Sequence, residues 1–309
     1  MTNMDTHVAR TARLRDLLVA PGCAVAVGGH DPAIARLVER AGFEIAYMGS
    51  SASSAAIAGV PDVSLVTFSE MLQNARHIVN ATTIPVLCDI DTGYGDTTIV
   101  KRAIREFEAA GAAGVHIEDQ TFPKRCGQTT GASLVSVAEM TAKIYAAKEA
   151  QSDADFVLIA RTDARQCEGL EGAIQRGRAY AAAGADAIFP EALINQDEFQ
   201  RYRDTVPGPL VTDVPEWGRS PMLSVQQLEA LGFGLALFAV STLRVALGAV
   251  ARFLADLRGN GTQRNWVSQM YTRESLDDLL GLSALRADES RLAEKTATRA
   301  LISTATPRA

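Results

Sequence analysis

Short apolar runs of four or five residues recur along most of the chain and alternate with longer amphipathic segments. Several runs follow closely on an Ala-Gly or Leu-Gly pair, as in AAGAAGVHIE at 109–118 and AAGADAIFPE at 182–191. Glycine suits the left-handed residue that closes a helix, and a short β-rich run suits a strand that is buried on both faces. We therefore predict eight strands, at residues 24–27, 45–48, 86–90, 115–118, 157–161, 187–190, 210–213 and 235–239.

These strands alternate with amphipathic segments such as 97–110 and 170–183, which predicts an α/β fold. Eight such units favour a TIM (β/α)8 barrel, because eight strands at this spacing are the number that closes. A doubly wound open sheet is the alternative. Past residue 258 the pattern changes to polar helical stretches, so we predict a barrel domain at 1–258 and a helical tail at 259–309. This tail either packs on a neighbouring subunit or is partly disordered.

Composition and charge narrow the class of protein. The chain has 309 residues, of which 47% are hydrophobic, and a net charge of -6, which argues against nucleic acid as the main partner. The most apolar stretch, 233–240, is too short to span a bilayer, so no membrane partner is expected. The four cysteines form no CxxC pair and no signal peptide is evident, so a reducing, cytoplasmic location fits best.

Polar residues cluster where the predicted strands end. In a (β/α)8 barrel, catalytic groups lie at the carboxyl ends of the strands. The clustered residues are Tyr47, Gly49, Ser50 and Ser51 on strand two, Asp89 and Asp91 on strand three, His116 and Glu118 on strand four, Arg161 on strand five, Glu191 on strand six and Asp213 on strand seven.

Three carboxylates of this set predict a metal site. Asp89 and Asp91 are two residues apart, so on a regular strand they would face the same way and repel each other. Glu118 adds a third carboxylate at the next strand end, and a hard divalent ion resolves the repulsion. We predict Mg²⁺, with Mn²⁺ as an alternative ion. Without a metal, the same residues would be solvated carboxylates and a helix cap, and His116 fits a core hydrogen bond better than a ligand.

The segment VHIEDQTFPKRCGQ at 115–128 holds the most reactive candidate. Cys126 lies beside Lys124 and Arg125, and adjacent positive charge is expected to lower the pKa of its thiol. Such a thiol can donate or accept a proton near neutral pH. The alternative role is that of a small buried hydrophobe. Arg161 is either a clamp for a substrate carboxylate or the partner of nearby acidic residues, Glu191 or Asp163.

Together these residues resemble the isocitrate lyase/phosphoenolpyruvate mutase superfamily, most closely its short bacterial 2-methylisocitrate lyase branch. The resemblance covers roughly residues 12–258 and extends more weakly into the tail. It implies a Mg²⁺-dependent TIM barrel that handles small carboxylic acids, and a homotetramer whose subunits exchange C-terminal helices. The matching blocks are GVPD (59–62), DIDTGYG (89–95), AGAAGVHIEDQ (110–120), PKRCG (123–127), ARTDA (160–164), FPEA (189–192) and GTQ (261–263).

The resemblance also implies a role for each matched residue. Asp91 is expected to bind Mg²⁺ directly, with Asp89 and Glu118 bound through waters. Arg161 is expected to hold the carboxylate of the oxo-acid half, with Glu191 near it and the metal.

The resemblance implies roles for four further residues, two of them in proton transfer. The resemblance implies that Cys126 protonates the carbanion that remains after C–C cleavage. It also implies that Lys124 supports Cys126, that Asp62 organises the site and that Tyr47 lines it.

The substrate-binding positions include departures from the resemblance. Gln128 follows the cysteine motif where the lyases usually have histidine, and Asp213-Val214-Pro215 stands where they have Asn-x-Thr. Asp213 places negative charge where a dianionic product would bind, so we expect an altered substrate. The residues expected to bind substrate are Gly49, Ser50, Ser51, Asp62, Gly127, Gln128, Arg161 and Asp213.

The sequence thus predicts a Mg²⁺-dependent carbon–carbon lyase that cleaves a 2-hydroxy carboxylic acid, similar to 2-methylisocitrate or dimethylmalate, into an α-oxo acid and a second carboxylate. An oxaloacetate decarboxylase or hydrolase, or a phosphonopyruvate-type enzyme, is the alternative within the superfamily. A catalytically reduced binding protein on the same barrel is the alternative from another class.

Overall fold

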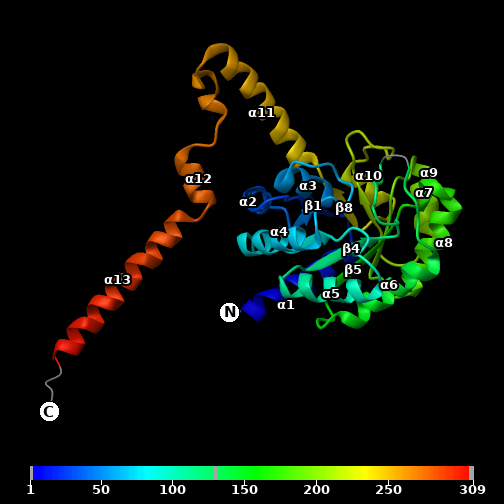
Figure 1. Ribbon diagram of the computed structural model, residues 1–309, viewed down its shortest axis with the longest axis horizontal. Coiled ribbons are helices and arrows are strands. Elements are labelled where there is room, and N and C mark those ends of the chain that lie inside the picture. Colours follow the sequence, from blue (N-terminus) through cyan, green and yellow to red (C-terminus); the bar gives the residue numbers. More distant parts are fainter. Residues whose placement is uncertain (1–2, 129–130, 306–309) are drawn as a thin grey trace. The chain divides into compact units, whose positions relative to one another are not determined.

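A single sheet of parallel strands forms the centre of the first compact unit of the chain (Figure 1). The computed structural model describes the backbone of residues 3–128 and 131–305 and the side chains of 10–128 and 131–296. The eight strands in these residues are β1 (Ala24–Gly28), β2 (Ile45–Met48), β3 (Val86–Asp89), β4 (Gly114–Glu118), β5 (Val157–Thr162), β6 (Ala187–Pro190), β7 (Val211–Asp213) and β8 (Leu235–Phe238).

The strand order confirms a nearly closed barrel. Neighbouring strands follow the order β6-β5-β4-β3-β2-β1-β8-β7, with each strand parallel to the next. The remaining gap, between β6 and β7, is bridged where Ile188 pairs with Leu210. There the backbone N–H of Ile188 donates to the carbonyl of Pro209 at 3.0 Å. The doubly wound open sheet is therefore ruled out. In that fold the first and last strands lie apart, whereas here β1 pairs directly with β8 as well as with β2.

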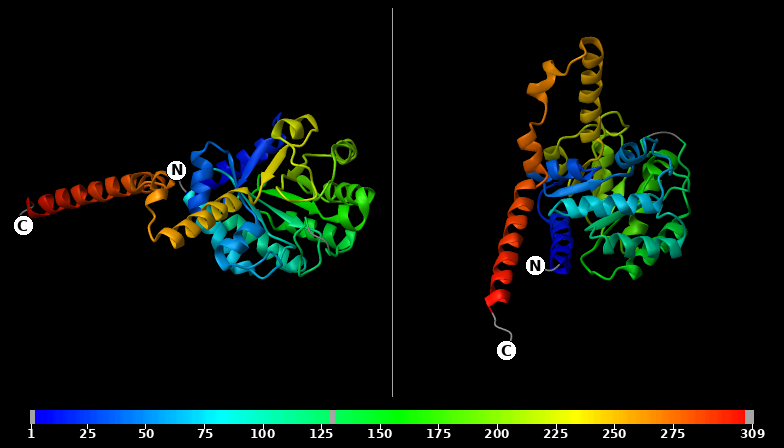
Figure 2. Two further views of the ribbon diagram at one scale, coloured as in Figure 1. Left: turned by 90° about the horizontal axis from the view of Figure 1, so that it is seen from above. Right: turned by 60° about the vertical axis from the view of Figure 1, so that its left-hand side comes forward.

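Helices surround this sheet (Figures 1 and 2). Gly111 and Gly184, which follow α5 and α8, have φ values of 89° and 101°, as their place at a helix end predicts. In the first part of the chain the helices are α1 (Asn3–Val19), α2 (Pro32–Arg40), α3 (Ser50–Ala58), α4 (Phe68–Ala81), α5 (Thr97–Ala109), α6 (Val137–Ala150), α7 (Ala164–Cys167), α8 (Gly169–Ala182), α9 (Gln196–Thr205) and α10 (Val225–Ala230).

Two apolar clusters fill the barrel, one on each face of the sheet. Alternate residues of a strand point to opposite faces, so Leu158 and Ala160 of β5 pack outward against the helices. Val157 and Ile159 of the same strand belong to the inner cluster. Leu14 and Leu18 of α1 join this inner cluster together with Ala113 and Leu235 at the amino ends of the strands. Helix α1 therefore closes the amino end of the barrel.

The rest of the chain forms a second, helical unit. The two compact units are Met1–Gly248 and Ala249–Ala309, so they divide within α11 (Ser241–Asn260), before the boundary we expect at residue 258. In the second unit, the ring of Phe253 packs edge-on against Trp266, with 5.8 Å between the centroids. The elements after α11 are η1 (Arg264–Gln269), α12 (Arg273–Leu279) and α13 (Leu282–Ala305).

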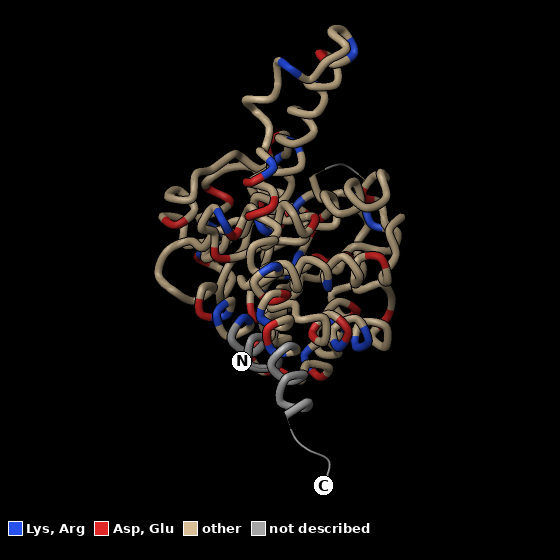
Figure 3. The backbone as a smooth tube through the Cα atoms, turned by 90° about the vertical axis from the view of Figure 1, so that its left-hand side faces the viewer, with Lys and Arg blue, Asp and Glu red and all other residues tan. Residues whose placement is uncertain are grey.

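The surface charge is mixed. Figure 3 shows basic and acidic residues interspersed along the barrel unit on the side in view. Among the helices of the described residues, none combines the length and apolar character that a membrane span requires.

The outer core generates a stability prediction. Phe107 of α5 is 0% exposed and packs edge-on against Phe68. We expect Phe107→Ala to lower the free energy of unfolding by about 3–5 kcal/mol, because it leaves a cavity in a packed core. Phe43→Ala, at a position that is 39% exposed, is the matched control and should cost much less. Urea unfolding of both variants measures this, and equal losses would contradict the packing described here.

Candidate active site

The inner face of the barrel carries polar residues at its carboxyl end. The inner residues of each strand are two apart, so the apolar inner positions lead directly to polar ones at the strand ends. On β5, Val157 and Ile159 lead to Arg161, and on β2, Ile45 leads to Tyr47. By the same alternation the remaining inner positions are Asp89, His116, Glu118, Glu191 and Asp213. The structure thus brings the predicted polar residues to one end of the barrel.

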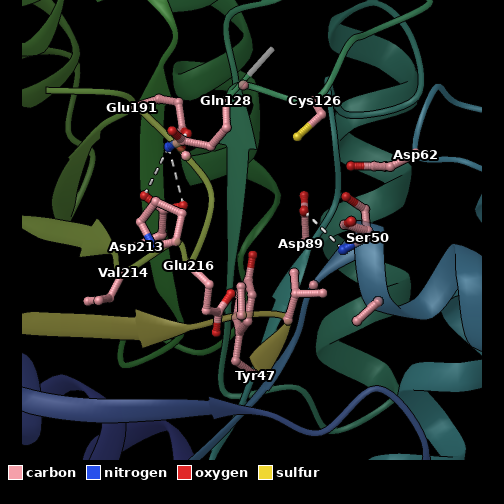
Figure 4. Close-up of a pocket in the computed structure, with 18 of the residues that line it drawn as sticks. Tyr47, Ser50, Asp62, Asp89, Cys126, Gln128, Glu191, Asp213, Val214 and Glu216 are labelled. Atoms are coloured by element: carbon pink, nitrogen blue, oxygen red, sulfur yellow. Dashed lines mark hydrogen bonds between the residues drawn. The ribbon is translucent and has the colours of Figure 1, made fainter. Parts of the chain in front are cut away.

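A pocket opens at this end (Figure 4). Of the predicted site residues, Asp91, Glu118 and Lys124 are not in its immediate lining, although Lys124 contacts it through Ser50 and Asp62. The predicted residues that line it are Tyr47, Gly49, Ser50, Ser51, Asp62, Asp89, Cys126, Gly127, Gln128, Arg161, Glu191 and Asp213.

The geometry at the end of β3 differs from the regular strand we expected. The strand ends at Asp89, and Asp91 adopts a left-handed conformation with φ of 50°. One carboxylate oxygen of Asp89, Oδ1, stabilises this turn by accepting a hydrogen bond from the backbone N–H of Asp91 at 2.9 Å. Its other oxygen accepts from the N–H of Ser50, the first residue of α3, at 3.1 Å. The turn and the positive end of a helix dipole therefore hold Asp89 in place.

Lys124 is a buried cation within this acidic group. Its ammonium lies 2.8 Å from Oδ1 of Asp62 and 2.9 Å from Oδ1 of Asp91. It also donates to the hydroxyl of Ser50 at 2.8 Å. Burial nevertheless raises the pKa of Asp91 to about 6, because the Lys124 charge only partly offsets the loss of solvent and the nearby Asp89 carboxylate.

Glu118 is the strongest sign of a missing positive charge. The side chain is 0% exposed, and neither of its oxygens makes a hydrogen bond to any described residue. Its closest cation is Arg161, whose Nε lies 3.3 Å from Oε2. Burial therefore raises the pKa of Glu118 well above its ordinary value.

These acidic residues fit a hard cation that keeps much of its water. Asp91 Oδ1 also lacks a hydrogen bond, although it is paired with Lys124. Within the described side chains, no three His, Cys, Asp or Glu groups converge closely enough to hold a metal ion by themselves. One direct ligand with further carboxylates acting through waters is the arrangement that Mg²⁺ tolerates.

Arg161 is the centre of a second charge cluster. It pairs with Asp163 in a two-bond fork, with Nε to Oδ2 at 3.1 Å and Nη2 to Oδ1 at 2.9 Å. Its Nη2 also lies 3.5 Å from Oε2 of Glu191. The predicted pairing with Glu191 or Asp163 is therefore confirmed for both acids, together with Glu118.

The thiol of Cys126 differs from our expectation. Burial raises its pKa, and the backbone N–H of Gln128 and the charge of Arg161 only partly oppose that effect. Adjacent positive charge does not dominate, because the ammonium of Lys124 is engaged by Asp62, Asp91 and Ser50. At neutral pH the sulfur is protonated, so the prediction of a lowered pKa is wrong. The group is suited to give a proton rather than to act as a thiolate.

Gly127 is required by close packing. A Cβ at this position would overlap Nη2 of Arg161 and Oδ1 of Asp163, and would lie 2.6 Å from Cγ of Glu191. A side chain here would therefore push apart the Arg161 cluster.

Gln128 joins the loop after β4 to the strand ends on the far side of the pocket. Its amide nitrogen donates to Oε1 of Glu191 and approaches both oxygens of Asp213 at 3.4 Å. Its amide oxygen accepts from the N–H of Arg219 at 2.7 Å. Burial raises the pKa of Asp213 to about 6, and Arg161 and Gln128 only partly compensate.

Tyr47 and His116 form a buried pair in the floor of the pocket. The Tyr47 hydroxyl lies 2.7 Å from Nε2 of His116, whose pKa burial lowers to about 4. His116 is therefore neutral and makes the core hydrogen bond that we expected. A Cβ at Gly49 would approach the Tyr47 ring to 2.7 Å, so the glycine allows the chain to pass over this ring.

Sequence reasoning missed two residues at the mouth of the pocket, Trp217 and Arg244. The guanidinium of Arg244 lies 5.1 Å from the centre of the Trp217 ring and 2.5 Å from Oε2 of Glu216. Arg244 is in the first turn of α11, just after β8, a strand end to which we assigned no site residue. Its place just after the eighth predicted strand could have identified Arg244 as a pocket residue from the sequence.

A barrel whose carboxyl end holds a buried acidic pocket with a protonated thiol defines an enzyme of the (β/α)8 class. The family model described as phosphoenolpyruvate phosphomutase matches residues 14–258. The chain is 39% identical to 2,3-dimethylmalate lyase of Eubacterium barkeri over 91% of this chain and 98% of that protein. It is 40% identical to 2-methylisocitrate lyase of Aeropyrum pernix, over 92% and 91%.

Solved structures agree with the sequence comparison. A crystal structure of 2,3-dimethylmalate lyase, named as a PEP mutase/isocitrate lyase superfamily member, has a TM-score of 0.87 and 32% identity over 92% of this chain and 95% of that one. Phosphonopyruvate hydrolase in complex with oxalate and Mg²⁺ has a TM-score of 0.83 and 33% identity, over 91% and 98%. The chain therefore belongs to the phosphoenolpyruvate mutase/isocitrate lyase superfamily. The named lyases confirm the predicted class, a carbon–carbon lyase.

The raised pKa of Asp213 predicts a pH-dependent stability effect. The folded value of about 6 exceeds the ordinary 3.8, so the folded state binds this proton more tightly. The contribution of Asp213 to stability is therefore full below about pH 4 and is lost as the pH rises through about 6. We expect the free energy of unfolding of Asp213→Asn, relative to that of the wild type, to rise by up to about 3 kcal/mol when the pH is raised from about 4.5 to about 8.

Urea unfolding at both pH values measures this relative gain. Asp204→Asn, on the exposed side of α9, is the matched control and should show no such trend. A larger relative stability of Asp213→Asn at the lower pH than at the higher pH would contradict the raised pKa of Asp213.

Proposed function

We propose that the protein is a Mg²⁺-dependent lyase that cleaves the C2–C3 bond of a 2-hydroxy carboxylic acid, giving an α-oxo acid such as pyruvate and a second carboxylate. The observation that carries this proposal is a thiol in the pocket lining beside a group of buried carboxylates just behind that lining. The buried carboxylate oxygens that lack hydrogen-bond donors belong to Glu118 and Asp91. The protonated thiol that lines the pocket is that of Cys126.

The metal would be held by the acidic group at the ends of β3 and β4. Asp91 would bind it directly, and Asp89 and Glu118 would bind through waters. When bound, Mg²⁺ stabilises negative charge that develops on the oxygen atoms of the substrate. The orphaned oxygens of Glu118 support this assignment, because a buried carboxylate requires a compensating charge.

The chain's own groups would bind the oxo-acid half. Ser50 and Ser51 open α3, whose first N–H groups have no partner within the helix and favour an anion. Asp163 holds Arg161 in a fixed orientation, so this guanidinium can face a substrate carboxylate without losing rotamer freedom. These contacts orient the bond to be broken.

Cys126 would complete the reaction by proton transfer. Loss of the 2-hydroxyl proton forms a carbonyl at C2, and the electrons of the C2–C3 bond pass to C3. The carboxylate on C3 delocalises that charge. The thiol then donates its proton to C3, which is the transfer that a protonated group can perform. The raised pKa of Cys126 supports the role of acid in the cleavage direction.

Two alternatives remain for the experiments to separate. A hydrolase or decarboxylase that acts on oxaloacetate or phosphonopyruvate has the same fold and metal requirement, and phosphonopyruvate hydrolase is among the similar structures. A binding protein would retain the barrel without turnover. The thiol in the pocket favours cleavage of a C–C bond over mere binding, because cleavage leaves a carbanion that must receive a proton and binding does not.

The assembly proposal rests on the second unit. Large hydrophobic residues are exposed along it, including Leu254, Val267, Leu276, Leu285 and Leu292. Exposed apolar surface of this extent is typical of a protein interface. It supports a homotetramer in which these helices pack on another subunit, and we propose that this assembly works in the cytoplasm.

Removal of the metal should abolish turnover. We expect EDTA to stop the release of an oxo acid from 2,3-dimethylmalate or 2-methylisocitrate, and added Mg²⁺ to restore it. Mg²⁺ should also raise the Tm of the wild type but not of Asp91→Asn, since binding to the folded state stabilises it. An Asp91→Asn variant with an unchanged Mg²⁺-induced shift would contradict the assignment of the direct ligand.

The thiol should be essential for cleavage. We expect Cys126→Ser to lower kcat for oxo-acid release by about 10²–10⁴-fold, because a hydroxyl is a much weaker acid. Cys23→Ser, at the amino end of the barrel, is the matched control and should keep wild-type turnover. Turnover of oxaloacetate or phosphonopyruvate that is indifferent to Cys126→Ser would favour the hydrolase instead.

A further inference from the structure

The pocket has two chemically different sides (Figure 4). Ser50, Asp62 and Asp89 lie on the side of the proposed metal. Gln128, Glu191, Asp213 and Glu216 lie opposite, with the apolar residues Val214, Pro215 and Val240 also in the lining. The second side faces whatever group the substrate carries beyond the reacting carbons.

The hydrogen-bonding groups of Gln128 are fully used within the protein. Its nitrogen points to the carboxylates of Glu191 and Asp213, and its oxygen accepts from the N–H of Arg219. These partners fix the orientation of the amide, because reversal would place oxygen against two carboxylates and nitrogen against an N–H. Gln128 therefore has no donor left for a substrate anion.

The cations near this side are also engaged. The lining contains two guanidinium groups and five carboxyl groups. Glu216 pairs with Arg244, which also stacks on Trp217. Arg161 is surrounded by Glu118, Asp163 and Glu191. An added carboxylate on this side would find no uncommitted positive charge in the described lining.

Glu191 points to the kind of group that does fit. Its side chain is 2% exposed and lines the pocket, and its Oε2 makes no hydrogen bond to a described residue. A buried acceptor of this kind is satisfied by a donor on the ligand. A neutral group with an N–H or O–H meets that need, whereas a carboxylate has no hydrogen to donate and would lie near Asp213.

We propose that the substrate is a 2-hydroxy dicarboxylic acid whose substituent on C3 is uncharged and donates a hydrogen bond, and that Asp213 and Glu191 exclude substrates with a third carboxylate. This inference rests on the proposed function, which requires one carboxylate on each side of the broken bond. It makes Gln128 a positioning residue, since it holds the two excluding carboxylates together.

The test compares two ligands of almost identical shape. Succinamate and succinate are the second products expected from substrates with a carbamoylmethyl or a carboxymethyl group on C3. Calorimetry with the wild-type protein in a Mg²⁺ buffer should show succinamate binding roughly ten- to a hundredfold more tightly. That factor corresponds to one unit charge about 6–12 Å from a carboxylate at an effective dielectric of about 20.

Asp213→Asn tests the cause of the preference. Removal of this charge should move the affinity ratio toward succinate by about tenfold, and Asp204→Asn, an exposed control on α9, should leave it unchanged. Damage to the barrel would weaken both ligands together and leave the ratio as it was. An unchanged ratio in an Asp213→Asn variant that still binds succinamate with wild-type affinity would overturn the assignment to this residue.

Turnover assays separate the inference from the function on which it rests. Equal or tighter binding of succinate, or no binding of either ligand, overturns the uncharged-substituent proposal even where 2-hydroxy acids release an oxo acid. Failure of every 2-hydroxy acid to release an oxo acid, with succinamate still preferred, overturns the lyase proposal alone.

Discussion

The burial of several carboxylates around very few cations is the constraint on which the site depends. Lys124 and Arg161 are the buried cations of the pocket region, and each already serves more than one acid. Burial raises the pKa of Asp91, Glu118, Glu191 and Asp213, which is costly for the fold. A protein retains such an arrangement when a ligand supplies the missing charge, so the charge deficit links stability to binding.

The barrel allows this cost because the deficit is confined to one end. Leu14 and Leu18 of α1 close the amino end with apolar contacts, and two hydrophobic clusters fill the sheet on both faces. In β2 to β7 the inner positions become polar toward the carboxyl ends of the strands. The apolar residues that stabilise the barrel and the polar residues of the site therefore lie at different levels of the same strands. The unfavourable burial of carboxylates at one level leaves the packing of the core unchanged.

Much of the fold could be predicted from the sequence, because period and spacing determine it. All eight strands were found, and the polar residues near the predicted strand ends include the inner side chains of the pocket. The alternation of β5, with Val157 and Ile159 before Arg161, is visible in the sequence alone. What failed depends on three-dimensional neighbours. The pKa of Cys126 could not be judged from Lys124, because the ammonium is drawn to Asp62 and Asp91 instead.

Gln128 has a consequence for motion as well as for charge. It lies two residues after Cys126 and is bonded to Glu191 on the end of β6 and to Arg219 in the segment after β7. Gln128 therefore connects the loop after β4 to the end of β6 and to the segment after β7. A ligand that draws Glu191 away from Gln128 releases one end of the segment that carries the proton donor. The same residue thus contacts the distal side of the pocket and belongs to the loop that carries the thiol.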